Sequence, residues 1–379
     1  MVKVNFALII FALFVTITPV VANEIVELTD ATESNGFPQW SHDGEKIAFV
    51  AITDVEDIGN TKINVMNSDG SNKAQLTSGK SLGWFFSLSG FGTANPWSSD
   101  GNRILYTSVL GLKIGDFAIP LKQNLCIINA DGTGKEKLRG TSNAKSFEWV
   151  QNGTKIFMVD RSNRLWLLDP DGTDKELLAS GDKNDSHFRC QPGGSKILYT
   201  SKGSDNYDLW LMNYDGSGKT QLTSAPDNED EMAWSPDGKK IVYVSKSVRD
   251  KTNYSTYQST TLNYSQTIWT MDADGTNKKQ LTLSNRNWDS SPQWSPDGTK
   301  IAFQRMDVGT PFYIAIMNSD GSNLTVLTAN DTTDISPQWS QKGDKITFMA
   351  YKNEKSTVSV ILLDEELVSE PATNVTIMS

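Results

Sequence analysis

Short apolar runs alternate with Asp-Gly turns along almost the whole chain. One unit, PQWSPDGTKIAF from Pro292, recurs with variation around seven anchor positions. The anchors are Trp40, Trp97, Trp149, Cys190, Trp234, Trp294 and Trp339. A second unit, represented by LWLMNYDGSGKTQLT from Leu209, has six copies between them. Because Asp and Pro favour a turn and Gly supplies the positive φ needed to leave it, each unit predicts a β-hairpin.

The two hairpins of a repeat predict one four-stranded antiparallel unit, with strands A to D. Runs such as KIAFV and LWLMN are almost continuously apolar, which is typical of strands buried on both faces. A single sheet cannot cover both faces, so the copies must pack against one another. The second hairpin is missing from the last repeat, and IVELT at Ile25–Thr29 matches its absent D strand. We therefore predict an all-β, seven-bladed propeller, in which the N-terminal strand completes the last blade and closes the ring.

The combination of W-S-P-D-G with M-N-x-D-G and a following L-T resembles the repeats of TolB, the periplasmic propeller of the bacterial Tol system. The resemblance covers roughly Glu24 to Asp364. It implies a TolB-like exported propeller that binds other proteins. TolB has six blades after a separate α/β domain, whereas this chain has seven repeat anchors. The resemblance therefore implies the fold more specifically than a place in the Tol machinery.

The N-terminus has the pattern of an export signal. Lys3 is followed by the apolar run Phe6–Val15, and small residues follow up to Ala22. The apolar stretch is short for a membrane-spanning helix, which favours a cleaved signal over a retained anchor. The expected parts are a signal peptide at 1–22, the propeller at 23–366 and a polar tail at 367–379. We therefore expect an extracytoplasmic protein, either secreted, periplasmic or at the cell surface, and not integral to the membrane after cleavage.

Charge and cysteine content narrow the choice of partner. The formal net charge is −10, which argues against nucleic acid or an anionic membrane surface as the main partner. The repeat places Cys126 in blade 2 and Cys190 in blade 4, which are not neighbours. Both cysteines are therefore expected to be free and buried.

Strand order places the A–B and C–D turns on one face of the propeller and the B–C and D–A connections on the other. The insertions all belong to the second class: Ile52–Thr61, Ser78–Asn95, Val109–Gln123 and Lys246–Gln266. Function commonly lies on variable loops carried by a rigid scaffold. The second insertion carries the aromatic residues Trp84, Phe85, Phe86 and Phe91. These side chains either form a contact surface for a partner or fold back over blades 1 and 2.

Polar acceptors stand five residues before the anchor in five of the repeats. They are Asn35, Asp185, Glu229, Asp289 and Asp334. One interpretation is an acidic ring at the channel mouth that holds a cation, a basic side chain or an amine-bearing ligand. The other is that each residue accepts backbone N–H bonds in its own D–A turn. The two interpretations are compatible, since an acidic residue in a turn still contributes to the electrostatic field at the channel mouth.

Catalytic motifs of the hydrolase, metalloprotease, P-loop and dinucleotide-binding kinds do not occur in the sequence. His187 could approach the channel mouth, and His42 lies in an A–B turn. Oligogalacturonate lyases, which are propellers with related repeats, use a His-rich metal site, and one candidate His does not make such a site. We expect a monomeric binding or scaffold module for a protein or peptide, with no cofactor, metal or catalytic residue. The alternative is an enzyme that acts on a glycan, lyase-like, or on a peptide at the channel face.

Overall fold

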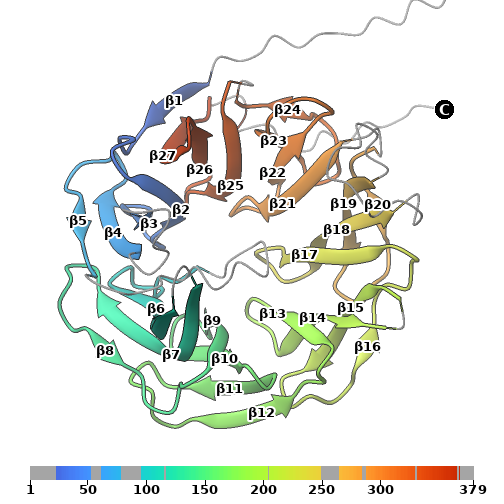
Figure 1. Ribbon diagram of the computed structural model, residues 1–379. Coiled ribbons are helices and arrows are strands. Elements are labelled where there is room, and N and C mark those ends of the chain that lie inside the picture. The colour runs from blue at the N-terminus through green and yellow to red at the C-terminus, as the bar shows by residue number, and fades with distance from the viewer. Residues whose placement is uncertain are drawn as a thin grey trace, which may run out of the picture.

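The computed structural model describes residues 23–52, 61–77, 95–114, 117–203, 205–248, 264–283, 287–328, 331–364 and 367. Within these residues, antiparallel sheets are arranged around a common centre (Figure 1). Four sheets have four strands and one has three; an eight-stranded sheet comprises two blades joined by a parallel bridge between Gln266 and Trp288. The described strands therefore form the predicted all-β propeller of seven blades.

The blades in the first part of the chain are numbered in sequence order, and their strands run from the inner A strand outward. Blade 1 contains β2 (Ser34–Trp40), β3 (Lys46–Ile52), β4 (Thr61–Asn67) and β5 (Ala74–Gln75). Blade 2 contains β6 (Arg103–Ile114), β7 (Phe117–Asn129) and β8 (Glu136–Lys137). Blade 3 contains β9 (Ala144–Val150), β10 (Lys155–Asp160), β11 (Arg164–Leu168) and β12 (Glu176–Ser180). In blade 2 the A segment contributes only an isolated bridge from Trp97 to Ile104.

The remaining blades repeat the same plan. Blade 4 contains β13 (Asp185–Cys190), β14 (Lys196–Lys202), β15 (Tyr207–Asn213) and β16 (Thr220–Gln221). Blade 5 contains β17 (Asn228–Trp234), β18 (Lys240–Val248), β19 (Tyr264–Asp272) and β20 (Lys279–Gln280). Blade 6 contains β21 (Trp288–Trp294), β22 (Lys300–Met306), β23 (Tyr313–Asn318) and β24 (Thr325–Val326). Blade 7 contains β25 (Thr333–Trp339), β26 (Lys345–Lys352), β27 (Lys355–Leu362) and the N-terminal β1 (Glu24–Glu27).

The two ends of the propeller sequence meet in blade 7. Strand β1 pairs antiparallel with β27, with Ile25 opposite Ile361. Blade 1 also contacts blade 7, because the indole N–H of Trp40 donates to the carbonyl of Gln338 at 3.3 Å. The prediction that the N-terminal strand completes the last blade is confirmed.

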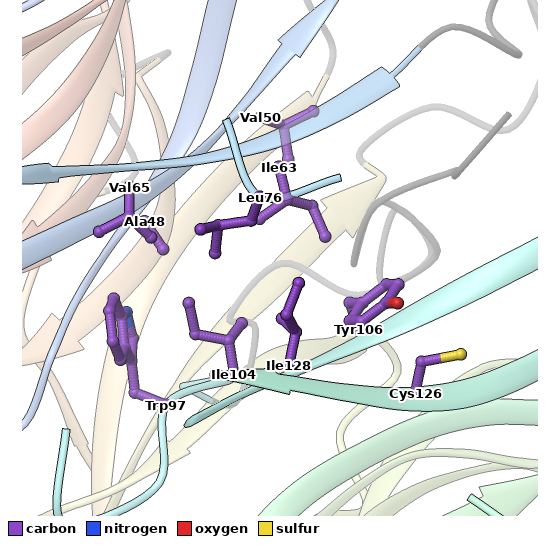
Figure 2. Packing of buried hydrophobic residues seen from close by; sticks show 10 residues of the cluster. All are labelled: Ala48, Val50, Ile63, Val65, Leu76, Trp97, Ile104, Tyr106, Cys126 and Ile128. Carbon is purple, nitrogen blue, oxygen red and sulfur yellow. The ribbon is translucent and has the colours of Figure 1, made fainter. Parts of the chain in front are cut away.

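Anchor tryptophans hold neighbouring blades together. Between blades 1 and 2, Trp97 and Ile104 face Ala48 and Val65 across a closely packed, buried interface (Figure 2). The indole N–H of Trp97 donates to the carbonyl of Gln39 in the preceding blade at 3.0 Å. The other anchor tryptophans, at 149, 234, 294 and 339, donate in the same way to the preceding blade. A Trp is favoured here because it fills the interface and still satisfies its N–H.

The insertion at Val109–Gln123 has regular structure. Strands β6 and β7 continue through it as a paired hairpin, with a register shift after Leu110, until Ile114 stands opposite Phe117. The connection is thus a long B–C hairpin. Most of the insertion at 78–95, including Trp84, Phe85, Phe86 and Phe91, lies outside the described residues.

Both cysteines are free and buried. Cys126 lies on β7 of blade 2, and Cys190 ends β13 of blade 4. The prediction for these two residues is confirmed.

Candidate functional site

A β-bulge recurs on the inner strand, three residues before the anchor. In blades 1, 4, 5, 6 and 7 the pairing of strands A and B slips at this point. The bulged residues have left-handed φ angles: Phe37 (54°), His187 (51°), Glu231 (51°), Ser291 (54°) and Ser336 (59°). This conformation is uncommon for residues with a side chain, and bulges redirect side chains near functional sites. The inner strands nearest the centre of the ring (Figure 1) are therefore the first place to seek a site.

Bulged backbone is linked from one blade to the next by side chains. Glu231 of blade 5 accepts the backbone N–H of Ser291 in blade 6 through Oε2 at 2.7 Å. In the same way, Gln304 of blade 6 accepts the N–H of Ser336 in blade 7 at 2.9 Å. A bulge leaves an N–H outside the strand ladder, and a buried N–H requires an acceptor. Buried polar side chains therefore connect the bulge of one blade to the blade before it.

A cluster of ionisable side chains lies on the inner strands of blades 4 and 5 and on β18, the strand next to the inner strand of blade 5. His187 Nδ1 is 3.0 Å from Asp230 Oδ1 and 3.2 Å from Thr200 Oγ1. Lys246 Nζ lies 2.8 Å from Glu231 Oε1 and 3.7 Å from Asp230 Oδ2. The side chains of His187, Asp230 and Lys246 remain 22–26% exposed. We call these four ionisable residues the inner-strand cluster: His187, Asp230, Glu231 and Lys246.

Burial and ion pairing act in opposite directions on the carboxyl groups of this cluster. Burial raises the pKa of Asp230, but the hydrogen bond and charge of His187, with Lys246, bring that pKa below its usual value. Burial raises the pKa of Glu231, and its contact with Lys246 offsets this only in part. The cluster therefore combines a readily ionised carboxylate, an imidazole and an ammonium group. Such a set can bind a polar ligand or exchange a proton with it.

A second acid–base pair, Glu148 with Arg189, lies between blades 3 and 4. Glu148 on β9 accepts the backbone N–H of Cys190 through Oε1 at 2.6 Å. Burial raises the pKa of Glu148, against the effect of the Arg189 guanidinium. This pair extends the polar surface of the inner strands from blade 5 back to blade 3.

The five predicted acceptor positions all lie at the start of an inner strand and are at most 6% exposed. Asn35 Nδ2 donates to the carbonyls of Asp30 and Glu33, at 3.2 and 3.0 Å. Asp185 Oδ2 accepts the N–H of Asp182 at 2.8 Å. The hydrogen bonds at these two positions are local. Only Asp185 accepts a backbone N–H, as the turn interpretation expects, whereas Asn35 donates to backbone carbonyls instead.

The other three acceptors bind side chains. Asp289 makes a two-pronged ion pair with Arg305, at 2.6 and 2.8 Å. Glu229 Oε2 accepts from Thr223 Oγ1 at 3.0 Å. Asp334 Oδ1 accepts from Thr332 Oγ1 at 2.6 Å. Equivalent positions in the repeat thus have different electrostatic surroundings.

Asp230 and Glu231 were not among the predicted site residues. They directly follow Glu229, so the sequence does contain a signal, the acidic run at 229–231. The bulge at Glu231 is what distinguishes them, because it changes the alternation of side chains along the strand. His187, by contrast, was singled out from the sequence and does lie in the inner-strand cluster.

Among the residues with described positions, no three His, Cys, Asp or Glu side chains gather closely enough to hold a metal ion. The inner-strand cluster contains two carboxyl groups and one imidazole, with Lys246 between the carboxyls. An ammonium group in that place occupies the position where a cation would otherwise bind the acids.

Comparisons with known proteins identify the fold. No family model matches the sequence, and no curated protein matches it. An oligogalacturonate lyase in complex with manganese has a TM-score of 0.63 and 15% identity, covering 91% of this chain and 94% of that one. The β-propeller domain of the Trilobed protease from Pyrococcus furiosus scores 0.60 at 12% identity, covering 90% and 100%. A putative TolB from Agrobacterium tumefaciens scores 0.51 at 18% identity, covering 88% and 99%. The chain therefore has a TolB-like β-propeller fold, which it shares with enzymes and with TolB proteins.

Proposed function

We propose that this protein is an exported propeller that binds a protein or peptide partner through the face carrying the B–C and D–A connections. The observation that carries the proposal is the difference between the two faces. The A–B and C–D turns are short and repeat the same hydrogen bonds, such as Ser295 Oγ to Asp297 Oδ1 at 2.6 Å. Strand order assigns the four predicted insertions to the opposite face, and the described one, the hairpin of β6 and β7, is a long B–C connection of that class.

The chemistry of the inner strands supports a partner with polar or basic groups. The inner-strand cluster places partly exposed carboxylate, imidazole and ammonium groups on neighbouring blades. Such groups fix the orientation of a ligand by hydrogen bonds, while the surrounding loops supply contact area.

Export is part of the proposal. The apolar segment in residues 1–22 supports it, as does the resemblance to TolB repeats. Along the described part of the chain, no helix has the length and apolar character needed to cross a membrane.

Site-specific crosslinking tests the choice of face. A photoreactive benzoylphenylalanine is placed at Lys113 in the β6–β7 hairpin, or at Lys239 in an A–B turn, where the lysine side chain is 81% exposed. Both proteins, made from residue 23 onward, are exposed to an envelope extract of the source organism. We expect a defined crosslinked partner from position 113 and none from position 239. Equal crosslinking at both positions would contradict the proposed face.

The second candidate is an enzyme of the lyase type, and the contact between His187 and Asp230 favours it. An imidazole held by a carboxylate is suited to proton transfer. Incubation with oligogalacturonides, with and without manganese, tests this activity through the appearance of unsaturated products. Activity that is lost in His187→Ala would support the enzyme, and no turnover under either condition would leave the binding module.

A further inference from the structure

A pocket of about 480 Å³ lies at the junction of blades 6 and 7. Its wall on the blade 7 side consists of β26, β27 and the N-terminal β1, and the connection from blade 6 forms another side. Lys352 and Lys355, which belong to the B–C hairpin of blade 7, line its edge. The pocket therefore opens toward the same face as the insertions.

The same place in blade 6 is filled by side chains of the protein. Asp289 stands opposite Arg305 in the pairing of β21 with β22, and the two form the two-pronged ion pair. The guanidinium carbon of Arg305 also lies 5.3 Å from the centre of the Phe303 ring. Tyr313, opposite Arg305 on β23, occupies further space. A buried carboxylate, a guanidinium and an aromatic ring thus form one packed unit.

Blade 7 keeps the carboxylate and the ring but lacks the two large side chains. Asp334 stands opposite Ala350, the position that Arg305 holds in blade 6. Thr357 stands opposite Ala350, where blade 6 has its tyrosine. Phe348, two residues before Ala350, corresponds to Phe303, and all four of these blade 7 residues line the pocket. The pocket is therefore the space that an arginine and a tyrosine fill one blade earlier.

Asp334 has hydroxyl partners, and the nearby lysines are engaged elsewhere. Its side chain accepts from Thr332 Oγ1 at 2.6 Å, and the residue is 1% exposed. Lys352 Nζ lies 3.4 Å from Asp331 Oδ2, and Lys355 Nζ donates to the carbonyl of Thr32 at 3.0 Å. Burial raises the pKa of Asp334, and only the hydroxyls of threonines oppose it.

We propose that this pocket binds a guanidinium group, which takes between Asp334 and Phe348 the place that Arg305 takes between Asp289 and Phe303. A planar guanidinium matches a carboxylate with two parallel hydrogen bonds and stacks on an aromatic ring. The volume is within the range of small-ligand pockets. The proposal does not depend on the proposed protein-binding function. The guanidinium belongs either to a free guanidino compound or to an arginine of a peptide.

Calorimetric titration of the full chain with agmatine tests the proposal. The comparison ligand is an analogue of agmatine in which a urea group replaces the guanidinium. The urea has the same shape but carries no charge. We expect one agmatine per chain and binding at least about tenfold weaker for the analogue. Asp334→Asn is expected to weaken agmatine binding by about tenfold or more. Asp174→Asn, the same change in an exposed turn of blade 3, should bind like the parent protein.

Ala350→Arg gives an independent test, because it supplies the guanidinium from within the chain. We expect this variant to melt at a higher temperature than the parent and to bind no agmatine. A titration of the parent with a capped Gly-Arg-Gly peptide separates the two sources of the ligand. Binding of the peptide at least as tight as agmatine identifies a peptide arginine, and binding of agmatine alone identifies a free compound. No heat of binding from either probe, or equal binding by parent and Ala350→Arg, overturns the proposal.

Discussion

Blades 5 and 6 place a carboxylic acid at the same position of the repeat and stabilise it in different ways. In blade 6, Asp289 is fully buried and pairs with Arg305 from the adjacent strand of its own blade. In blade 5, Glu229 is 1% exposed and contacts a second carboxyl, Asp208 on β15 of blade 4. The first acid is paired with a guanidinium, whereas burial and the neighbouring carboxyl groups raise the pKa of the second above its usual value.

This difference shows which structural features the repeat fixes in every blade and which features vary from one blade to the next. The backbone position, the bulge and the anchor Trp recur in both blades. The partner of the acid comes from β22 in one case and from the preceding blade in the other. A repeat can therefore preserve its fold while each blade interface acquires its own electrostatics.

The largest effect is expected when the partner in blade 6 is removed. Arg305→Ala leaves Asp289 buried without a counter-charge, so we expect a loss of about 3–5 kcal/mol in the free energy of unfolding. Urea unfolding followed by tryptophan fluorescence measures this loss. The double variant Asp289→Asn with Arg305→Met should recover most of the stability, because no charge is then buried alone. A loss below about 1 kcal/mol for the single variant would show that the pair is not desolvated in solution.

The buried Glu229 of blade 5 predicts that the stability of the protein depends on pH. Burial raises the pKa of Glu229 to about 8, and the neighbouring Asp208 and Asp227 add to the shift. The folded protein therefore holds a proton that the unfolded chain releases near its ordinary pKa of about 4.3. Since the native state then binds more protons, stability is highest at the acid end of this window. It falls as pH rises toward about 8, by about 2–4 kcal/mol in all.

Glu229→Gln isolates that contribution. The variant keeps the shape and cannot ionise, so it should match the parent near pH 4 and be the more stable protein near pH 8. Urea midpoints measured across this range give both curves. Curves that stay parallel would mean that Glu229 titrates normally in the folded protein.

A smaller effect is expected where blades 5 and 6 meet through the bulge. Glu231→Ala removes the acceptor of the Ser291 N–H and the partner of Lys246, and we expect a loss of about 1.5–3 kcal/mol. Glu231→Gln keeps an acceptor oxygen and should lose less. Hydrogen exchange gives a local measurement, because the amide of Ser291 should lose protection in the Ala variant. Unchanged protection of that amide would contradict the role given to Glu231.

The fold was predictable because several independent features of each repeat indicate the same four-stranded unit. An anchor Trp, an Asp-Gly turn and a strand-length apolar run agree in almost every copy, and Ile25–Thr29 fits the only vacant D strand. The candidate site was less predictable. The bulge at His187 and Glu231 interrupts the alternation on which strand patterns depend. The pocket beside Asp334 arises from Ala350 and Thr357, whose small size becomes informative only when the pairing register is known.

The smallest effect should be equal in the two blades, since their A–B turns share one chemistry. In blade 5, Ser235 Oγ donates to Asp237 and accepts the N–H of Lys240; Ser295 makes the same two bonds in blade 6. We expect Ser235→Ala and Ser295→Ala each to lose about 1 kcal/mol, and the double variant to lose the sum, because the two turns share no partner. Urea midpoints of the three variants measure this. Unequal single losses would show that the blades differ in their turns as well as in their buried acids, and the contrast between Glu229 and Asp289 would then reflect a general difference in blade stability.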